Sequence, residues 1–274
     1  MRVFFWSVCS LLVSSAAFAQ TSAPNPPDLL KDIDINIQNP IKPDAAVPIS
    51  NEPHHALVFK NDFVHVYNVT VPPLDATLLH QHDLPYIYLV LGATDVVNAV
   101  QGKPEVDLNL PDGATRFTPG GFAHIARTDA GIGFHNITIE LAKPQASPRN
   151  LPAGGPDRPL GACPLASPDP KRNPQVPSEQ EVPCFETDEL RLDVVHVEGG
   201  KDYEVAAPQN SALLVAESNA NLDVSLGGQH AAFLHAGDVL WLPAGTSRKI
   251  EDFLGIKSSF LLLSFKDTSP NTTN

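Results

Sequence analysis

The most constraining feature of this sequence is that its second half repeats the pattern of its first half. A shift of 126 residues relates the matched positions early in each copy, and a shift of 124 relates those further on. A repeat of about ninety residues predicts two copies of one domain. The matched positions are Phe59, Asp62, Val64, Val66, Val69 and Val71 with Phe185, Asp188, Leu190, Leu192, Val195 and Val197, and then Gly113, Pro119 and Gly121 with Gly237, Pro243 and Gly245.

Short runs typical of β-strands fill the first copy. From residue 54 to about residue 143, alternating or β-rich runs such as VHVYNVTV and YIYLVL are separated by turn signals such as PDG and PGG. Because none of these runs has a helical period, the pattern predicts an all-β sandwich or barrel. We expect domains at residues 51–145 and 185–267, and a hairpin near Thr128 that places His135 opposite His124.

Three histidines of the first copy stand out by their spacing. His80 and His82 lie in ATLLHQH, and alternate side chains of an extended strand share one face. His124 ends the pattern G-x5-P-x-G-x-x-H, which begins at Gly113. Together they offer the imidazole ligands of a divalent transition metal, with Fe, Mn, Zn, Cu and Ni all admissible. The alternative is that they are ordinary core or surface histidines that happen to fit the spacing.

These two segments resemble the two motifs of the cupins, G-x5-HxH-x3-4-E-x6-G and G-x5-PxG-x2-H-x3-N. The second motif fits from Gly113 to His124, whereas the glutamate of the first falls on Tyr86 or Ile87. The resemblance implies tandem antiparallel β-barrels of the double-stranded β-helix, or jelly-roll, type: a bicupin. It also implies that His80, His82 and His124 bind a metal inside the first barrel, without the usual carboxylate ligand.

Two other residues of the first copy are candidates for the missing fourth ligand. Tyr86 could be a ligand or an acid/base group, and the alternative is an aromatic side chain that only lines the barrel. His135 could be a fourth ligand or a hydrogen-bond donor behind a ligand, and it fits a pocket wall equally well. His54 and His55, which precede the first strand, are expected to be surface histidines.

The second copy lacks the histidines of the first. It carries Arg248 where the first copy has His124, and GGKDYEVAAPQNSALL, its first-motif region, contains no histidine. The resemblance therefore implies a degenerate second barrel. Arg248 could bind a carboxylate or phosphate at the mouth of that barrel, or it could be a surface or interface arginine beside Glu251 and Asp252.

The N-terminal part of the chain predicts export. Residues 1–19 combine one positive charge, an apolar run and Ala17 and Ala19 in an A-x-A arrangement, which is typical of a cleavable signal peptide. We expect a secreted or periplasmic protein that starts with a Pro-rich arm at residues 20–50. The net charge of −13 becomes −14 once Arg2 is removed, and such an acidic chain is a poor partner for nucleic acid.

A Pro/Gly-rich linker at residues 146–184 separates the two domains, and residues 268–274 form a tail. Cys163 and Cys184 are the two cysteines left after export. Since an oxidising compartment favours disulfides, we expect them to be bonded to each other.

The sequence leaves the function open between three classes. The first is an enzyme, such as a metal-dependent oxygenase or isomerase acting on a small anionic molecule; the catalytic residues are not identified. The second is a non-catalytic module that binds a metal or small ligand. The third is a scaffold for homo-oligomers, since the resemblance to cupins implies pairing through sheets. No segment after the signal peptide is long and apolar enough to cross a membrane.

Overall fold

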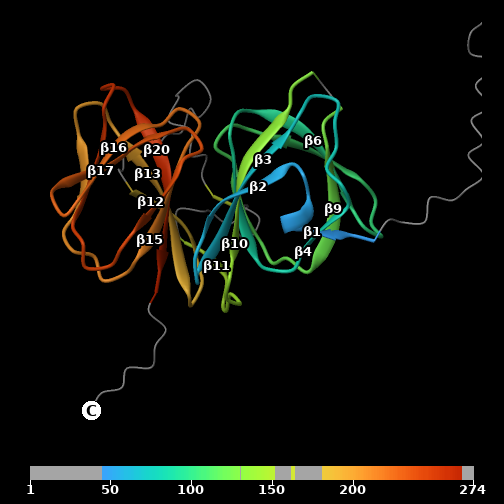
Figure 1. Ribbon diagram of the computed structural model, residues 1–274, viewed down its shortest axis with the longest axis horizontal. Coiled ribbons are helices and arrows are strands. Elements are labelled where there is room, and N and C mark those ends of the chain that lie inside the picture. Colours follow the sequence, from blue (N-terminus) through green and yellow to red (C-terminus); the bar gives the residue numbers. More distant parts are fainter. Residues whose placement is uncertain (1–44, 130, 152–161, 164–180, 267–274) are drawn as a thin grey trace, which may run out of the picture. The chain divides into compact units, whose positions relative to one another are not determined.

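The computed structural model describes residues 45–129, 131–151, 162–163 and 181–266, and these residues form β-strands and loops with a single 3-10 turn, η1 (Ile49–Asn51) (Figure 1). The predicted all-β fold is confirmed. The described residues include no helix that is long and apolar enough to cross a membrane.

The first barrel consists of two five-stranded sheets, with strands from the blue to the yellow-green part of the chain (Figure 1). One sheet has the order β1-β4-β9-β6-β7 and the other has the order β2-β3-β10-β5-β8. The strands are β1 (Val47–Pro48), β2 (His55–Lys60), β3 (Val64–Val71), β4 (His80–His82), β5 (Tyr86–Val90), β6 (Thr94–Val100), β7 (Val106–Leu110), β8 (Thr115–Thr118), β9 (Phe122–Arg127) and β10 (Phe134–Leu141).

The second barrel repeats this arrangement with sheets β11-β12-β13-β20-β15-β18 and β14-β19-β16-β17. Its strands follow the shifts seen in the sequence, so that β12 and β13 correspond to β2 and β3, and β20 corresponds to β10. The strands are β11 (Arg149–Asn150), β12 (Glu181–Glu186), β13 (Leu190–Val197), β14 (Asp202–Val205), β15 (Ala212–Ala216), β16 (Asn221–Leu226), β17 (Gln229–His235), β18 (Val239–Leu242), β19 (Arg248–Asp252) and β20 (Ser258–Phe265).

A large apolar core joins the two barrels. Strands β10 and β20 are buried along nearly their whole length, because one face of each lines its own barrel and the other face packs into the shared core. Phe117 of the first barrel stacks on Phe185 of the second with ring centroids 4.6 Å apart. Ile137 and Ile139 of β10 lie in the same core. This packing explains the continuous hydrophobic runs in these strands.

The hairpin expected near Thr128 does not form. Strand β9 pairs with β4 and β6, whereas β10 pairs with β3 and β5 in the other sheet. The chain therefore crosses between sheets after β9 instead of turning back beside it. His135 lies opposite Thr70 of β3, not opposite His124.

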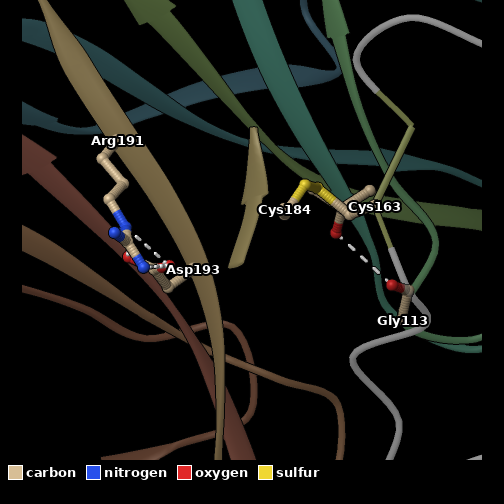
Figure 2. The surroundings of a disulfide bond; sticks show 6 residues. Gly113, Cys163, Cys184, Arg191 and Asp193 are labelled. Carbon is tan, nitrogen blue, oxygen red and sulfur yellow. Dashed lines mark hydrogen bonds and ion pairs between the residues drawn. A yellow bond between two sulfur atoms is a disulfide. The ribbon is translucent and has the colours of Figure 1, made fainter. Parts of the chain in front are cut away.

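The expected disulfide is present: Cys163 and Cys184 are bonded, with their Cα atoms 5.0 Å apart (Figure 2). Cys184 lies within β12, and β11 pairs with β12, so strand structure extends into the stretch predicted to be a linker. Cys163 is held beside the first barrel, since its backbone N–H donates to the carbonyl oxygen of Thr115. The predicted signal peptide, most of the arm and the tail lie outside the described residues.

Candidate metal centre

Strands β4 and β9 bring the three predicted histidines together inside the first barrel. His80 lies directly opposite His124 in the β4–β9 register, and their ring centroids are 4.5 Å apart. His82 follows on the same face of β4, with its ring centroid 5.2 Å from that of His124. The Nε2 atoms of His80 and His82 are 3.2 Å apart, and both side chains are buried.

The turn before β9 explains why the motif carries glycines. Gly120 has a φ of +74°, and a Cβ atom there would lie 2.2 Å from the carbonyl oxygen of Leu84. Only glycine allows this close approach. The next residue, Gly121, donates its N–H to the carbonyl oxygen of His82 at 2.7 Å, which aligns β9 with β4.

His55 is a fourth imidazole of the cluster, and the expectation that it is a surface residue is wrong. Its side chain is only 5% exposed, and its ring centroid is 4.6 Å from that of His80. Ligand atoms of His55, His80 and His82 all lie within 4.8 Å of one another. The register explains this position, because His55 lies opposite Val69 of β3, whose side chain also lines the barrel interior.

Glu52 holds the ring of His55 in place. Its Oε2 atom accepts a hydrogen bond from His55 Nδ1 at 2.5 Å. Its Oε1 atom accepts hydrogen bonds from Nδ1 of His54 and from the N–H of Leu78. Burial raises the pKa of Glu52, but hydrogen bonds from His55 and His54 outweigh it and lower the pKa to about 2. The buried carboxylate therefore stays ionised and leaves Nε2 of His55 free to bind a metal.

Hydrogen bonds that the Nδ1 atoms donate also orient the rings of His80 and His124. His80 Nδ1 donates to the carbonyl oxygen of Leu78 at 2.9 Å, and His124 Nδ1 donates to Asn98 Oδ1 at 2.7 Å. These partners assign the tautomers and leave lone pairs on both Nε2 atoms. Nε2 of His124 and Nδ1 of His82 are buried with no hydrogen-bond partner among the described residues.

The three motif histidines are neutral at physiological pH. Burial, aided by the neighbouring imidazoles, lowers the pKa to about 4 for His80, about 3 for His82 and about 2 for His124. Neutral imidazole is the form that binds metal. These side chains are thus in the protonation state that binds metal, and imidazole ligands suit a divalent transition metal.

A cavity of about 550 Å³ opens over the cluster. Tyr86 lines it and stacks on His82, with ring centroids 4.3 Å apart and an interplanar angle of 24°. Burial raises the pKa of Tyr86, so its phenol stays protonated. Arg116 is the only lysine or arginine among the lining residues of the described chain. The apolar lining residues are Val69, Val96, Val106, Leu108, Leu110, Phe117, Pro119, Phe122, Ala126, Phe134 and Pro148.

Glu140 is a buried carboxylate near the cluster that the sequence patterns did not single out. Its Oε1 atom lies 3.8 Å from His82 Nδ1, and its Oε2 atom lies 3.6 Å from His65 Nδ1. Burial raises its pKa. Since Glu140 lies opposite Tyr86 in the β5–β10 register, its side chain shares the barrel-facing side of the sheet.

The structure does not bring His135 to this cluster. His135 lies on the opposite face of β10 from Asn136 and Thr138, which line the cavity. Its Nε2 atom is hydrogen-bonded to Asn68 Oδ1 at 2.9 Å. Burial lowers its pKa, and it is not a member of the described histidine group.

Comparisons with known proteins find similarity in structure alone. No family sequence model matches the chain, and no curated protein matches it in sequence. AerE from Microcystis aeruginosa is similar in structure, with a TM-score of 0.52, 9% identity and coverage of 79% of this chain and 99% of that chain.

Two enzymes are also similar in structure. Salicylate 1,2-dioxygenase from Pseudoaminobacter salicylatoxidans has a TM-score of 0.50 and 14% identity, over 74% of this chain and 68% of that chain. A point mutant of oxalate decarboxylase from Bacillus subtilis has a TM-score of 0.51 and 12% identity, over 76% of this chain and 70% of that chain. At such identities the likeness concerns the fold.

Proposed function

We propose that this chain, which is a bicupin by fold, binds one divalent transition metal through His55, His80, His82 and His124 and is a metal-dependent oxygenase acting on a small carboxylic acid. The observation that carries the proposal is the buried Nε2 atom of His124, which has no hydrogen-bond partner among the described residues and belongs to a ring beside those of His80 and His82. A lone pair that makes no hydrogen bond inside a protein is costly unless a ligand takes it up.

The ligand set supports a substrate that is an anion. The imidazole ligands carry no negative charge, and the ionised carboxylate of Glu52 behind His55 offsets only part of the charge of a divalent metal, so a negatively charged group is favoured beside it. A bound metal would act as a Lewis acid and would polarise a substrate oxygen. Arg116, from β8, provides a second positive charge on the cavity wall.

The remaining wall residues suit the body of a small organic molecule. The aromatic side chains of Phe117, Phe122 and Phe134 form an apolar part of the cavity wall, which favours an organic ligand over water. Tyr86, as a protonated phenol against His82, can hold or deliver a proton at the substrate. Export from the cytoplasm through the predicted signal peptide is part of this proposal.

Metal analysis of the purified mature protein tests the binding site. We expect close to one equivalent of metal per chain, and loss of that metal in the His80→Ala and His82→Ala variants. His135→Ala is the matched control, because His135 lies outside the cavity and should leave the metal content unchanged. A full equivalent of metal in the double His80→Ala and His82→Ala variant would place the site elsewhere.

Oxygen uptake with a panel of small aromatic and aliphatic carboxylic acids tests the reaction class. The loaded protein should consume oxygen with at least one acid, and the Arg116→Met variant should show a raised KM for that acid. Stoichiometric metal without any turnover would favour the non-catalytic binding module instead.

A further inference from the structure

The second barrel contains a buried arginine that has no ion-pair partner among the described side chains. Arg248, the first residue of β19, is 6% exposed. Its Nε and Nη1 atoms are buried, and neither has a hydrogen-bond partner among the described residues. The interpretation of Arg248 as a surface arginine is therefore wrong.

Arg248 occupies the position that His124 has in the first barrel. In the first barrel, His124 lies between His80 of β4 and Val100 of β6. In the second, Arg248 lies between Val205 of β14 and Leu226 of β16. The repeat thus replaces a cluster of metal ligands by one cation between two apolar side chains.

Glu181, whose charge acts on Arg248, and the neighbouring Asp193 are already engaged by other groups. Glu181 Oε2 accepts a hydrogen bond from the hydroxyl of Tyr203 at 2.9 Å, and Glu181 Oε1 lies 3.6 Å from Arg191. Both carboxylate oxygens of Asp193 lie 2.9 Å from Arg191 Nε, which donates to them (Figure 2). Among the described residues, no carboxylate oxygen lies within ion-pair distance of Arg248.

An arginine in this position needs a counter-charge. Burial lowers the pKa of Arg248, but a guanidinium remains protonated at neutral pH. An unpaired buried charge is strongly destabilising, whereas a paired and hydrogen-bonded one is tolerated. The described part of the barrel supplies no such partner.

We propose that Arg248 binds the carboxylate of a small monocarboxylic acid inside the second barrel. A single negative charge matches the single guanidinium that lacks an ion-pair partner, whereas a dianion such as phosphate carries more negative charge than one guanidinium offsets. The flanking side chains of Val205 and Leu226 favour a ligand with a short apolar group. This site needs no metal and is independent of the function proposed for the first barrel.

Thermal unfolding of the full-length mature protein at constant ionic strength, with and without sodium butyrate, tests the site. Saturating butyrate should raise Tm by about 2–5 °C, because a ligand that binds only the folded state stabilises it. Inorganic phosphate should leave Tm unchanged. The Arg248→Met variant should lose the response to butyrate, and its Tm without butyrate should equal or exceed that of the wild type, since the unpaired charge is gone.

Three further variants complete the test. Arg191→Met removes a paired arginine nearby and should keep the butyrate response, although its Tm falls. Arg248→Lys keeps the charge and should keep a weaker response, which guards against a folding defect in Arg248→Met. The double His80→Ala and His82→Ala variant should also keep the response. The proposal is overturned if butyrate leaves wild-type Tm unchanged, if phosphate stabilises equally, or if the response survives in Arg248→Met or disappears in the double histidine variant.

Discussion

Glu52 and His55 form a buried pair in which the carboxylate Oε2 accepts a hydrogen bond from the imidazole Nδ1 at 2.5 Å. The pair joins the end of η1 to the start of β2, and it holds His55 where its ligand atom lies within 4.8 Å of those of His80 and His82. A carboxylate behind a ligating histidine fixes the ring and raises its basicity. The first barrel thus gains an imidazole in the cluster from a segment outside both histidine motifs.

The Glu52→Gln variant should bind the metal ten- to a hundredfold more weakly, as is typical when such a partner is lost. Competition with a chelator of known affinity measures this change. Asp75→Asn is the control, because Asp75 is exposed and its carboxylate contacts the neighbouring ring of His54 and the N–H of Ala76 but no histidine of the cluster. In a His55→Ala background, Glu52→Gln should have little further effect. Equal losses in both backgrounds would contradict the role of the pair.

Asn98 should control the metal affinity through His124. Its Oδ1 atom accepts a hydrogen bond from His124 Nδ1 at 2.7 Å. The Asn98→Ala variant should therefore weaken metal binding about ten- to a hundredfold, whereas Asn98→Asp should strengthen it by making the imidazole more basic. Asn109→Ala serves as the control, since Asn109 contacts only the exposed carboxylate of Asp95. If both Asn98 variants match the wild type in chelator competition, His124 does not bind the metal.

The core of the cluster could be predicted from the sequence because it depends on local geometry. His80 and His82 share a face through strand parity alone. The turn at Gly120 and Gly121 brings His124 beside them, and Gly121 is one of the fixed positions of the motif. The disulfide followed from there being two cysteines after export and was confirmed.

The residues that sequence reasoning missed depend on long-range pairing. The burial of His55 follows from its register with Val69, fourteen residues further on, and no local pattern reveals that register. The expected hairpin after β9 failed for the same reason, because sheet membership is decided by strands far apart in the chain. The burial of Arg248 was likewise hidden, since an arginine beside acidic residues looks like an exposed one.

Phe185 should be essential to the stability of both barrels. It is fully buried, belongs to β12, and stacks on Phe117 of β8 in the shared core. The Phe185→Ala variant should lose about 3–5 kcal/mol of the free energy of unfolding, as is usual for a large core side chain. Phe253→Ala is the control, because Phe253 is exposed, and it should lose less than about 1 kcal/mol. Urea unfolding measures both, and equal effects would contradict the shared core.

Glu217 should make the folded protein less stable as the pH rises. Its side chain is fully buried after β15, and Ser218 Oγ lies 2.6 Å from Glu217 Oε1 and 2.5 Å from Asp112 Oδ1 of the first barrel. One hydroxyl supplies one proton, so the second short contact needs a proton on a carboxyl group. Burial is the main cause that raises the pKa of Glu217 to about 7 from 4.5.

The sign of the pH effect follows from the two pKa values of Glu217. Between pH 4.5 and about pH 7 the folded state keeps the proton while the unfolded state releases it, so the free energy of unfolding decreases as the pH rises. The decrease from this group amounts to roughly 3 kcal/mol and is complete above about pH 7. In the Glu217→Gln variant, whose amide can donate to Ser218 at any pH, the decrease should vanish.

Urea unfolding at pH 5, 6 and 8 compares how the free energy of unfolding changes with pH in the wild type and in Glu217→Gln. The exposed Glu198→Gln is the control and should keep the wild-type slope. Equal slopes in wild type and Glu217→Gln would show that Glu217 does not hold a proton in the folded protein.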